Sequence, residues 1–247
     1  MGTALAGEKF LAVKLIGREE VAEGTMAFRF QKPANWAFKA GQSLDMTLLN
    51  PPESDAEGNT RAFSLASAPQ EDFLMIATRM RDTAFKRTLK ALPIGAEVKI
   101  EGPFGNLTLH NKSSRAAVLL AGGIGITPFR SMVVRAAREK LPHRIFLFYG
   151  NRRPEDAAFL DELRALEADN PNYKLIAAMS EMENSKRPWQ GESGFIDDRM
   201  LSKHLIGAAS PIYYVAGPPA MVETMREILS KQSVDDDDIR SEEFSGY

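Results

Sequence analysis

Two glycine-rich segments in the second half of the sequence are suited to phosphate binding. Residues 119–128 read LLAGGIGITP and residues 213–221 read YYVAGPPAM, each an apolar run followed by a turn. Glycine lets the backbone approach a ligand closely, and a helix that begins there presents free N–H groups to a phosphate. The first segment does not fit the G-x-G-x-x-G pattern, so each turn alone is also compatible with a tight connection. Together, at the carboxyl ends of two parallel strands, they could flank one nucleotide.

A third candidate, Arg61-Ala62-Phe63-Ser64, lies in the first half. Arginine offers a fork of donors to a phosphate. The Phe63 ring could pack on a flat heterocycle, and the Ser64 hydroxyl could bond a ring heteroatom. Taken alone, the segment is equally a strand with a surface arginine.

The sequence contains no cysteine and three histidines that lie far apart, His110, His143 and His204. Disulfides, cysteine-ligated iron–sulfur clusters and a thiol nucleophile are therefore excluded within the chain. The histidines have no metal-ligand spacing, and we expect no metal site. Redox chemistry would have to rest on an organic cofactor.

Charge and hydropathy argue against nucleic acids and membranes as partners. The formal charge is −2 over 247 residues, and no apolar run reaches 18 residues. Residues 1–10 lack a basic segment followed by an apolar stretch, so we expect no signal peptide and a cytoplasmic location.

Short strands fill the first half. Alternating or apolar runs predict strands at residues 10–18, 25–30, 43–49, 73–79 and 96–101, with a Pro/Asp/Glu/Gly/Asn loop at 50–60. A helix is expected at residues 84–91, capped by Asp82 or Thr83. Strands at this spacing predict an antiparallel barrel or sandwich.

The second half alternates strands with helices. We predict strands at residues 116–121, 144–149, 174–179 and 212–216, and helices at 128–140, 155–168, 197–205 and 220–231. Such alternation is typical of an α/β doubly wound parallel sheet. We therefore expect two domains, residues 1–112 and 113–247. The acidic run at 235–238 is expected to be a solvated turn.

The order of these motifs resembles that of the ferredoxin–NADP+ reductase superfamily. The shared motifs are RAFS, GPFGN, LLAGGIGITP, VAGPPAM and a terminal E-x-F, and they cover nearly the whole chain. The resemblance implies an FAD-binding antiparallel β-barrel followed by an NAD(P)-binding α/β domain. It implies an FAD-dependent NAD(P)H reductase that transfers hydride to flavin N5.

The resemblance also assigns FAD contacts. Arg61 matches the pyrophosphate ligand, Phe63 an aromatic against the flavin, and Ser64 the serine near N5. The other residues implied at FAD are Ala62, Thr78, Arg79, Met80, Phe85, Lys86, Thr127 and Tyr247. The helix bearing Lys86 usually begins with G-x-x-S in the family, and here Thr83 and Lys86 replace the glycine and serine. The helix N-terminus still offers N–H groups, and Lys86 adds charge.

The nucleotide turns and the tail complete the assignment. The residues implied at NAD(P) are Gly122, Gly123, Gly125, Ile126, Thr127, Ala216, Gly217, Pro218, Pro219 and Met221. Ala216 stands where many members have a cysteine, which removes a polar group beside the nicotinamide. Glu242 matches the glutamate of the terminal motif, with its neighbour Glu243 as the alternative, and Phe244 matches the aromatic that shields the flavin. Ser64, Glu242 and Phe244 are the catalytic candidates, although a frayed tail is the alternative for the last residues.

The sequence does not determine which nicotinamide nucleotide the protein uses or which electron acceptor it serves. Arg152, Arg153, Lys186 and Arg187 favour a 2′-phosphate and hence NADP, whereas Glu181 favours NAD. Electrons must leave to a separate acceptor, which the resemblance allows to be a ferredoxin, a flavodoxin, an oxygenase component or a small molecule. The alternatives are a free-flavin or ferric-chelate reductase and a catalytically weak nucleotide-binding regulatory subunit.

Overall fold

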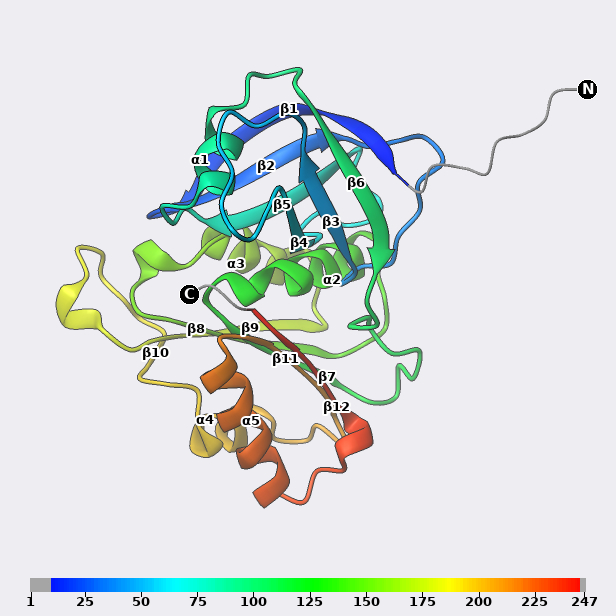
Figure 1. The fold of residues 1–247 in the computed structure, drawn as a ribbon. Coiled ribbons are helices and arrows are strands. Elements are labelled where there is room, and N and C mark those ends of the chain that lie inside the picture. The colour runs from blue at the N-terminus through cyan, green and yellow to red at the C-terminus, as the bar shows by residue number, and fades with distance from the viewer. Residues whose placement is uncertain (1–9, 245–247) are drawn as a thin grey trace, which may run out of the picture.

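The computed structural model describes residues 10–244 and contains two six-stranded sheets, one above the other (Figure 1). The first sheet is antiparallel, in the order β4-β3-β6-β1-β2-β5. Its strands are β1 (Leu11–Ala22), β2 (Thr25–Gln31), β3 (Ser43–Leu48), β4 (Thr60–Ser64), β5 (Phe73–Arg79) and β6 (Glu97–Phe104). The helix α1 (Ala84–Ala91) connects β5 to β6.

This first sheet curls until its two edge strands meet. The Ala66 N–H, just beyond β4, donates to the Met75 carbonyl of β5 at 2.8 Å. The inward residues of the strands fill the space between, among them Leu15, Phe28 and Met46, which are at most 1% exposed. The result is the expected antiparallel barrel, in which alternate side chains point inward.

The second sheet is parallel, in the order β10-β9-β8-β7-β11-β12. Its strands are β7 (Ala117–Gly122), β8 (Ile145–Asn151), β9 (Tyr173–Met179), β10 (Glu192–Ser193), β11 (Ile212–Gly217) and β12 (Ile239–Glu243). Chain order reverses between β7 and β11, so the sheet has its switch point there. All six residues of β7 and all six of β11 are buried, as expected of strands covered on both faces.

Helices cover both faces of the parallel sheet (Figure 1). Helices α2 (Ile126–Arg138) and α3 (Leu160–Asp169) lie between this sheet and the barrel, whereas α4 (Asp198–His204) and α5 (Pro219–Lys231) cover the far face. Apolar residues of α2 and α3 share one core with barrel residues such as Met75, and residues of α4 and α5 build another. Short 3-10 turns occur at Gly123–Gly125, Pro154–Asp156, Met182–Asn184 and Asp236–Asp238.

Several sequence-based boundaries were wrong. The helix expected at 155–168 is interrupted because Phe159 adopts a left-handed conformation (φ 62°), so α3 begins only at Leu160. Strand β1 continues four residues past 18, and α2 begins two residues before Pro128. The cap of α1 is Thr83, whose hydroxyl accepts from the Lys86 N–H. The short strand β10 was not expected.

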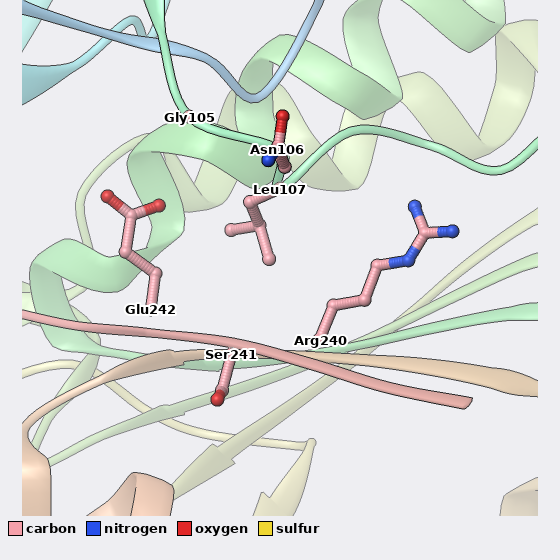
Figure 2. A pocket seen from close by; sticks show the side chains of 6 residues that line it. All are labelled: Gly105, Asn106, Leu107, Arg240, Ser241 and Glu242. Atoms are coloured by element: carbon pink, nitrogen blue, oxygen red, sulfur yellow. The ribbon is translucent and has the colours of Figure 1, made fainter. Parts of the chain in front are cut away.

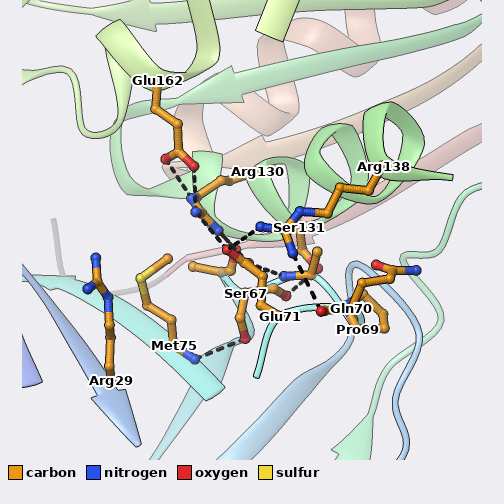
Figure 3. A network of polar contacts seen from close by, with 12 residues as sticks. Arg29, Ser67, Pro69, Gln70, Glu71, Met75, Arg130, Ser131, Arg138 and Glu162 are labelled. Carbon is orange, nitrogen blue, oxygen red and sulfur yellow. Dashed lines mark hydrogen bonds and ion pairs between the residues drawn. The ribbon is translucent and has the colours of Figure 1, made fainter. Parts of the chain in front are cut away.

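A buried ion network ties the barrel to α2 (Figure 3). Arg130 of α2, which is 5% exposed, donates to the Ala66 carbonyl at 2.7 Å and to Glu71 at 3.0 Å. On its other side it donates to both oxygens of Glu162 on α3. The neighbouring Ser131 donates to the Ser67 carbonyl at 2.6 Å. These bonds link the helix that follows the first glycine-rich turn to the segment that follows Ser64.

Candidate functional site between the barrel and the parallel sheet

The two glycine-rich turns meet at the switch point of the parallel sheet. A Cβ atom on Gly125 would lie 2.2 Å from the Ala216 carbonyl oxygen, and one on Gly122 would lie 2.2 Å from the Met221 sulfur. The clash at Gly125 is with backbone, so glycine is required there for the turns to touch, whereas at Gly122 the flexible Met221 side chain would have to move. Gly217 also lies close to the first turn, since its Cβ would come within 3.1 Å of the Gly122 nitrogen. The predicted nucleotide residues are therefore brought together.

Each turn then opens a helix. Gly123 and Gly125 belong to a 3-10 turn that runs directly into α2, and Pro219 is the first residue of α5. Thr127 is almost fully buried, and its hydroxyl donates to the Ile124 carbonyl at 3.1 Å. The Thr127 side chain thus stabilises its own turn, and the backbone N–H groups at the start of α2 are the candidate anion-binding groups of this segment.

Ser64 and Glu242 lie far apart in sequence and meet across the boundary between the sheets. The Ser64 hydroxyl donates to a carboxylate oxygen of Glu242 at 3.4 Å. Glu242 pairs in register with Ala216 on the neighbouring strand β11, so it lies beside the second glycine-rich turn. Burial raises the pKa of Glu242 above its usual value, and the hydrogen bond from Ser64 offsets this only in part.

The C-terminal segment is a strand up to Glu243, and the last three residues, to which the frayed-tail alternative applied, lie outside the described residues. β12 forms the edge of the parallel sheet beside β11, and the Phe244 N–H continues the pairing by donating to the Gly217 carbonyl at 3.0 Å. The Phe244 ring is half-buried against the core shared by the barrel and the sheet. Tyr247, predicted to stack on the flavin or the adenine, lies outside the described residues.

A cavity of about 630 Å³ adjoins Glu242 (Figure 2). Its walls are residues 105–107, which follow β6, and Arg240, Ser241 and Glu242 of β12. Figure 2 shows the Arg240 and Glu242 side chains on the same side as Leu107, with Ser241 pointing the other way, as the alternation of a strand requires. The volume is in the range of about 300–1,000 Å³ typical of ligand pockets. Sequence reasoning assigned no role to Asn106 or Arg240, although Asn106 ends the GPFGN motif.

The residues predicted at the flavin phosphates form a second cluster on the barrel. The Arg61 guanidinium lies 5.1 Å over the Phe85 ring, and the Phe63 ring lies 5.9 Å from that of Phe85. Lys86 is half-buried on the same helix, and its pKa is lowered by burial and by repulsion from Arg81 and Arg61. A guanidinium and an ammonium group held this close together suit a diphosphate.

The other predicted flavin residues lie at the end of β5 and on β4. Thr78 is 7% exposed, Arg79 lies 4.0 Å from Asp156, and the Met80 N–H donates to the Gly24 carbonyl at 2.8 Å. Ala62 is exposed on β4 between Arg61 and Phe63. The predicted residues thus lie in two groups joined by β4: one around Arg61, the predicted phosphate cluster, and one around Ser64, the predicted redox cluster.

Two further observations concern metals and membranes. Among residues 10–244, no group of three or more His, Asp or Glu side chains is arranged to hold a metal ion. In the same part of the chain, no helix combines the length and the apolar character needed to cross a membrane.

Comparison with known proteins agrees with this geometry. Residues 119–227 match the oxidoreductase NAD-binding domain family. The chain is 28% identical over 202 residues to one subunit of the Na+-translocating NADH-quinone reductase of Methylococcus capsulatus, covering 75% of this chain and 49% of the relative. It is 26% identical over 230 residues to the electron transfer component of toluate 1,2-dioxygenase of Pseudomonas putida, covering 92% and 65%.

The fold is also that of solved reductases. A ferredoxin NADP+ reductase from Neisseria gonorrhoeae, solved with bound FAD and NADP, superposes with a TM-score of 0.77 at 20% identity, covering 96% of this chain and 99% of that one. The chain spans about half to two thirds of the length of the two relatives above. The chain therefore contains an oxidoreductase NAD-binding segment, and it has the fold of ferredoxin–NADP+ reductases.

Proposed function

We propose that the protein is an FAD-dependent NAD(P)H oxidoreductase that passes electrons to a separate acceptor. The observation that carries the proposal is the contact between Ser64 and Glu242, which lies on β12 next to β11, one of the two strands that flank the switch point. This contact brings the Arg61–Ser64 segment of the barrel, which we propose binds the flavin, beside both glycine-rich turns. A nicotinamide and a flavin bound at these two motifs would meet there.

The barrel residues bind and orient FAD in this proposal. Arg61, Lys86 and the N-terminus of α1 hold the diphosphate, and Phe63 packs against the cofactor. Ser64 directs its hydroxyl to the redox edge of the ring. When bound, FAD accepts a hydride at N5 and releases the electrons singly to the acceptor.

The parallel sheet supplies the nucleotide side. The turns at Gly122–Gly125 and Gly217–Pro219 form the floor of the site, and the start of α2 faces the nucleotide phosphates. The small Ala216 leaves room for the nicotinamide. Burial raises the pKa of Glu242, and its carboxyl group can exchange a proton beside Ser64 with solvent through the adjoining cavity.

Phe244 closes the site in the absence of nucleotide. Its N–H is bonded to the carbonyl of Gly217, within the second glycine-rich turn, which supports a position of Phe244 next to the proposed nucleotide site. We propose that the ring moves aside when the nicotinamide binds. The predicted role of Tyr247 at the flavin or adenine belongs to the same proposal.

NADH is the nucleotide that the charges favour. Arg153 is already paired with Asp156 and Glu23, each at 2.9 Å, and Arg152 lies 3.7 Å from Glu181. These residues follow β8, the neighbour of β7, where the 2′-position of the ribose is read in doubly wound folds. Both arginines are balanced by carboxylates, which leaves little free positive charge for a 2′-phosphate.

The acceptor is proposed from the relatives. Reductase components of oxygenases and a component of a quinone reductase are among them, so we propose a separate carrier or oxygenase component as acceptor. A free-flavin or ferric-chelate reductase is the second candidate, because residues 105–107 and 240–242 line an open cavity beside the redox cluster.

We place the domain boundary at residue 112, in the turn between β6 and β7, and propose a cytoplasmic location.

Anaerobic titration with NADH and with NADPH tests the proposal. The FAD-loaded protein should lose the visible absorbance of its oxidised flavin with either nucleotide, at lower NADH than NADPH concentration. A protein that binds FAD and nucleotide without bleaching would instead be the regulatory subunit. Oxidation by free FMN or a ferric chelate, without any protein partner, would identify the diffusible-acceptor reductase.

A further inference from the structure

The phosphate cluster on the barrel is already occupied by carboxylates of the same chain. Residues 53–58 lie in the loop between β3 and β4 and fold back over Arg61. One carboxylate oxygen of Asp55 accepts from Arg61 at 2.9 Å, and a carboxylate oxygen of Glu57 lies 3.0 Å from the same guanidinium nitrogen. One terminal nitrogen of the side chain expected to bind the flavin diphosphate is therefore already paired with carboxylates of its own loop.

Backbone carbonyls complete the enclosure of Arg61. Its second terminal nitrogen donates to the carbonyls of Glu57, Gly58 and Thr60 at 2.8–3.0 Å. The loop itself is fixed by a turn in which the Gly58 N–H donates to the Asp55 carbonyl at 3.0 Å, with Gly58 at a positive φ of 72°. A phosphate could reach Arg61 only after these residues move.

Asp55 also uses the other donors of the cluster. It accepts from the Glu57 N–H at 3.1 Å and from the N–H of Phe85 in the first turn of α1. Burial alone would raise the pKa of Asp55, but the bonds from Arg61 and these N–H groups outweigh it and hold that pKa below its usual value. A guanidinium together with a helix N-terminus is a donor set that suits a phosphate oxygen, and Asp55 takes that place.

We propose that the Asp55 loop is a built-in competitor for the flavin diphosphate, so that FAD binds only to the fraction of molecules in which the loop is open. This inference rests on the proposed FAD function. A binding-competent state that is only partly populated weakens the apparent affinity by that fraction. FAD therefore exchanges more readily than it would from the phosphate cluster without the loop. In the FAD-loaded protein the loop is displaced from Arg61.

A matched pair of variants isolates the effect of Asp55. Asp55→Asn removes the charge that faces Arg61. Glu53→Gln is the matched control. It removes one charge from the same loop, but the two Glu53 carboxylate oxygens accept from Arg87, at 2.8 and 2.5 Å, and not from Arg61. Both variants change the net charge equally, and neither residue belongs to the proposed binding machinery for FAD. The whole chain, freed of flavin, is titrated with FAD and binding is followed by the quenching of flavin fluorescence.

The expected result is a Kd for FAD lowered about two- to fivefold in Asp55→Asn, the range that an exposed ion pair allows, with faster FAD association. Glu53→Gln should change the Kd by less than half as much. An unchanged or raised Kd in Asp55→Asn, or an equal decrease in Glu53→Gln, overturns the competition. Failure of the wild-type chain and of every variant to bind FAD would refute the proposed function, and this inference with it.

Discussion

Arg130 offers the most direct test of how the two halves of the molecule are held together. Replacing Arg130 with Met removes the cation from a network in which Glu71 is only 6% exposed. Losing one partner of a buried pair costs about 3–5 kcal/mol, because the other charge stays buried without compensation. Glu71 keeps the Ala68 N–H at 2.6 Å and Arg138 at 3.7 Å, which places the expected cost near the lower end, at about 3 kcal/mol.

Thermal unfolding followed by circular dichroism measures this cost. For a chain of this size, about 1 kcal/mol corresponds to about 2–4 °C, so Arg130→Met should lower Tm by about 6–12 °C. The double variant Arg130→Met, Glu71→Gln should recover most of the loss, because the uncompensated carboxylate is gone. Arg135→Met on the same helix is the control, since Arg135 pairs with Glu139 at the surface and should cost less than about 1 kcal/mol. A loss in Arg130→Met no larger than in the control, or no recovery in the double variant, would refute this reasoning.

Three further predictions concern the proposed redox site. Gly125→Ala should weaken NADH binding and lower Tm, because the new Cβ would lie 2.2 Å from the Ala216 carbonyl oxygen. The control Gly17→Ala should do neither, because nothing lies within 4 Å of a Cβ at that position. Equal effects in both variants would contradict the packing of the two turns. The Tm of Glu242→Gln should rise relative to that of the wild type as the pH increases above about 4.5. The reason is that the pKa of Glu242 is higher in the folded than in the unfolded protein, so ionisation of this side chain destabilises the folded wild type. A difference in Tm between the two proteins that stays constant from pH 4 to 8 would contradict this. Truncation after Glu243 should lower the Kd for NADH and change the rate of flavin reduction, since the Phe244 ring no longer has to move, and unchanged values in binding and stopped-flow measurements would count against a shielding role.

The strands and the glycine-rich turns were predictable because their signals are local. The run at β7 is continuously apolar, and the strand–turn–helix pattern follows it directly in sequence. The parallel order and the switch point then follow from general rules for doubly wound sheets. The meeting of Ser64 and Glu242 was not visible in spacing, although resemblance to the family selected both residues.

Other features depend on contacts that no local pattern encodes. β12 has a single buried residue, Ile239, and is a strand because β11 offers it a parallel edge. Phe159 interrupts an otherwise helical pattern through its backbone conformation alone. Arg130 has the sequence signature of an ordinary helix-surface cation, and only packing against the barrel buries it.

The most direct test of the central claim is anaerobic stopped-flow reduction of the FAD-loaded protein by NADH, protiated or deuterated at the transferred C4 position. Transfer of hydride at the Ser64–Glu242 contact predicts rapid bleaching of the flavin band that is slower with the deuterated nucleotide. It also predicts that Gly125→Ala needs more NADH to reach the same rate. A flavin that stays oxidised in the presence of saturating NADH and NADPH would contradict the account.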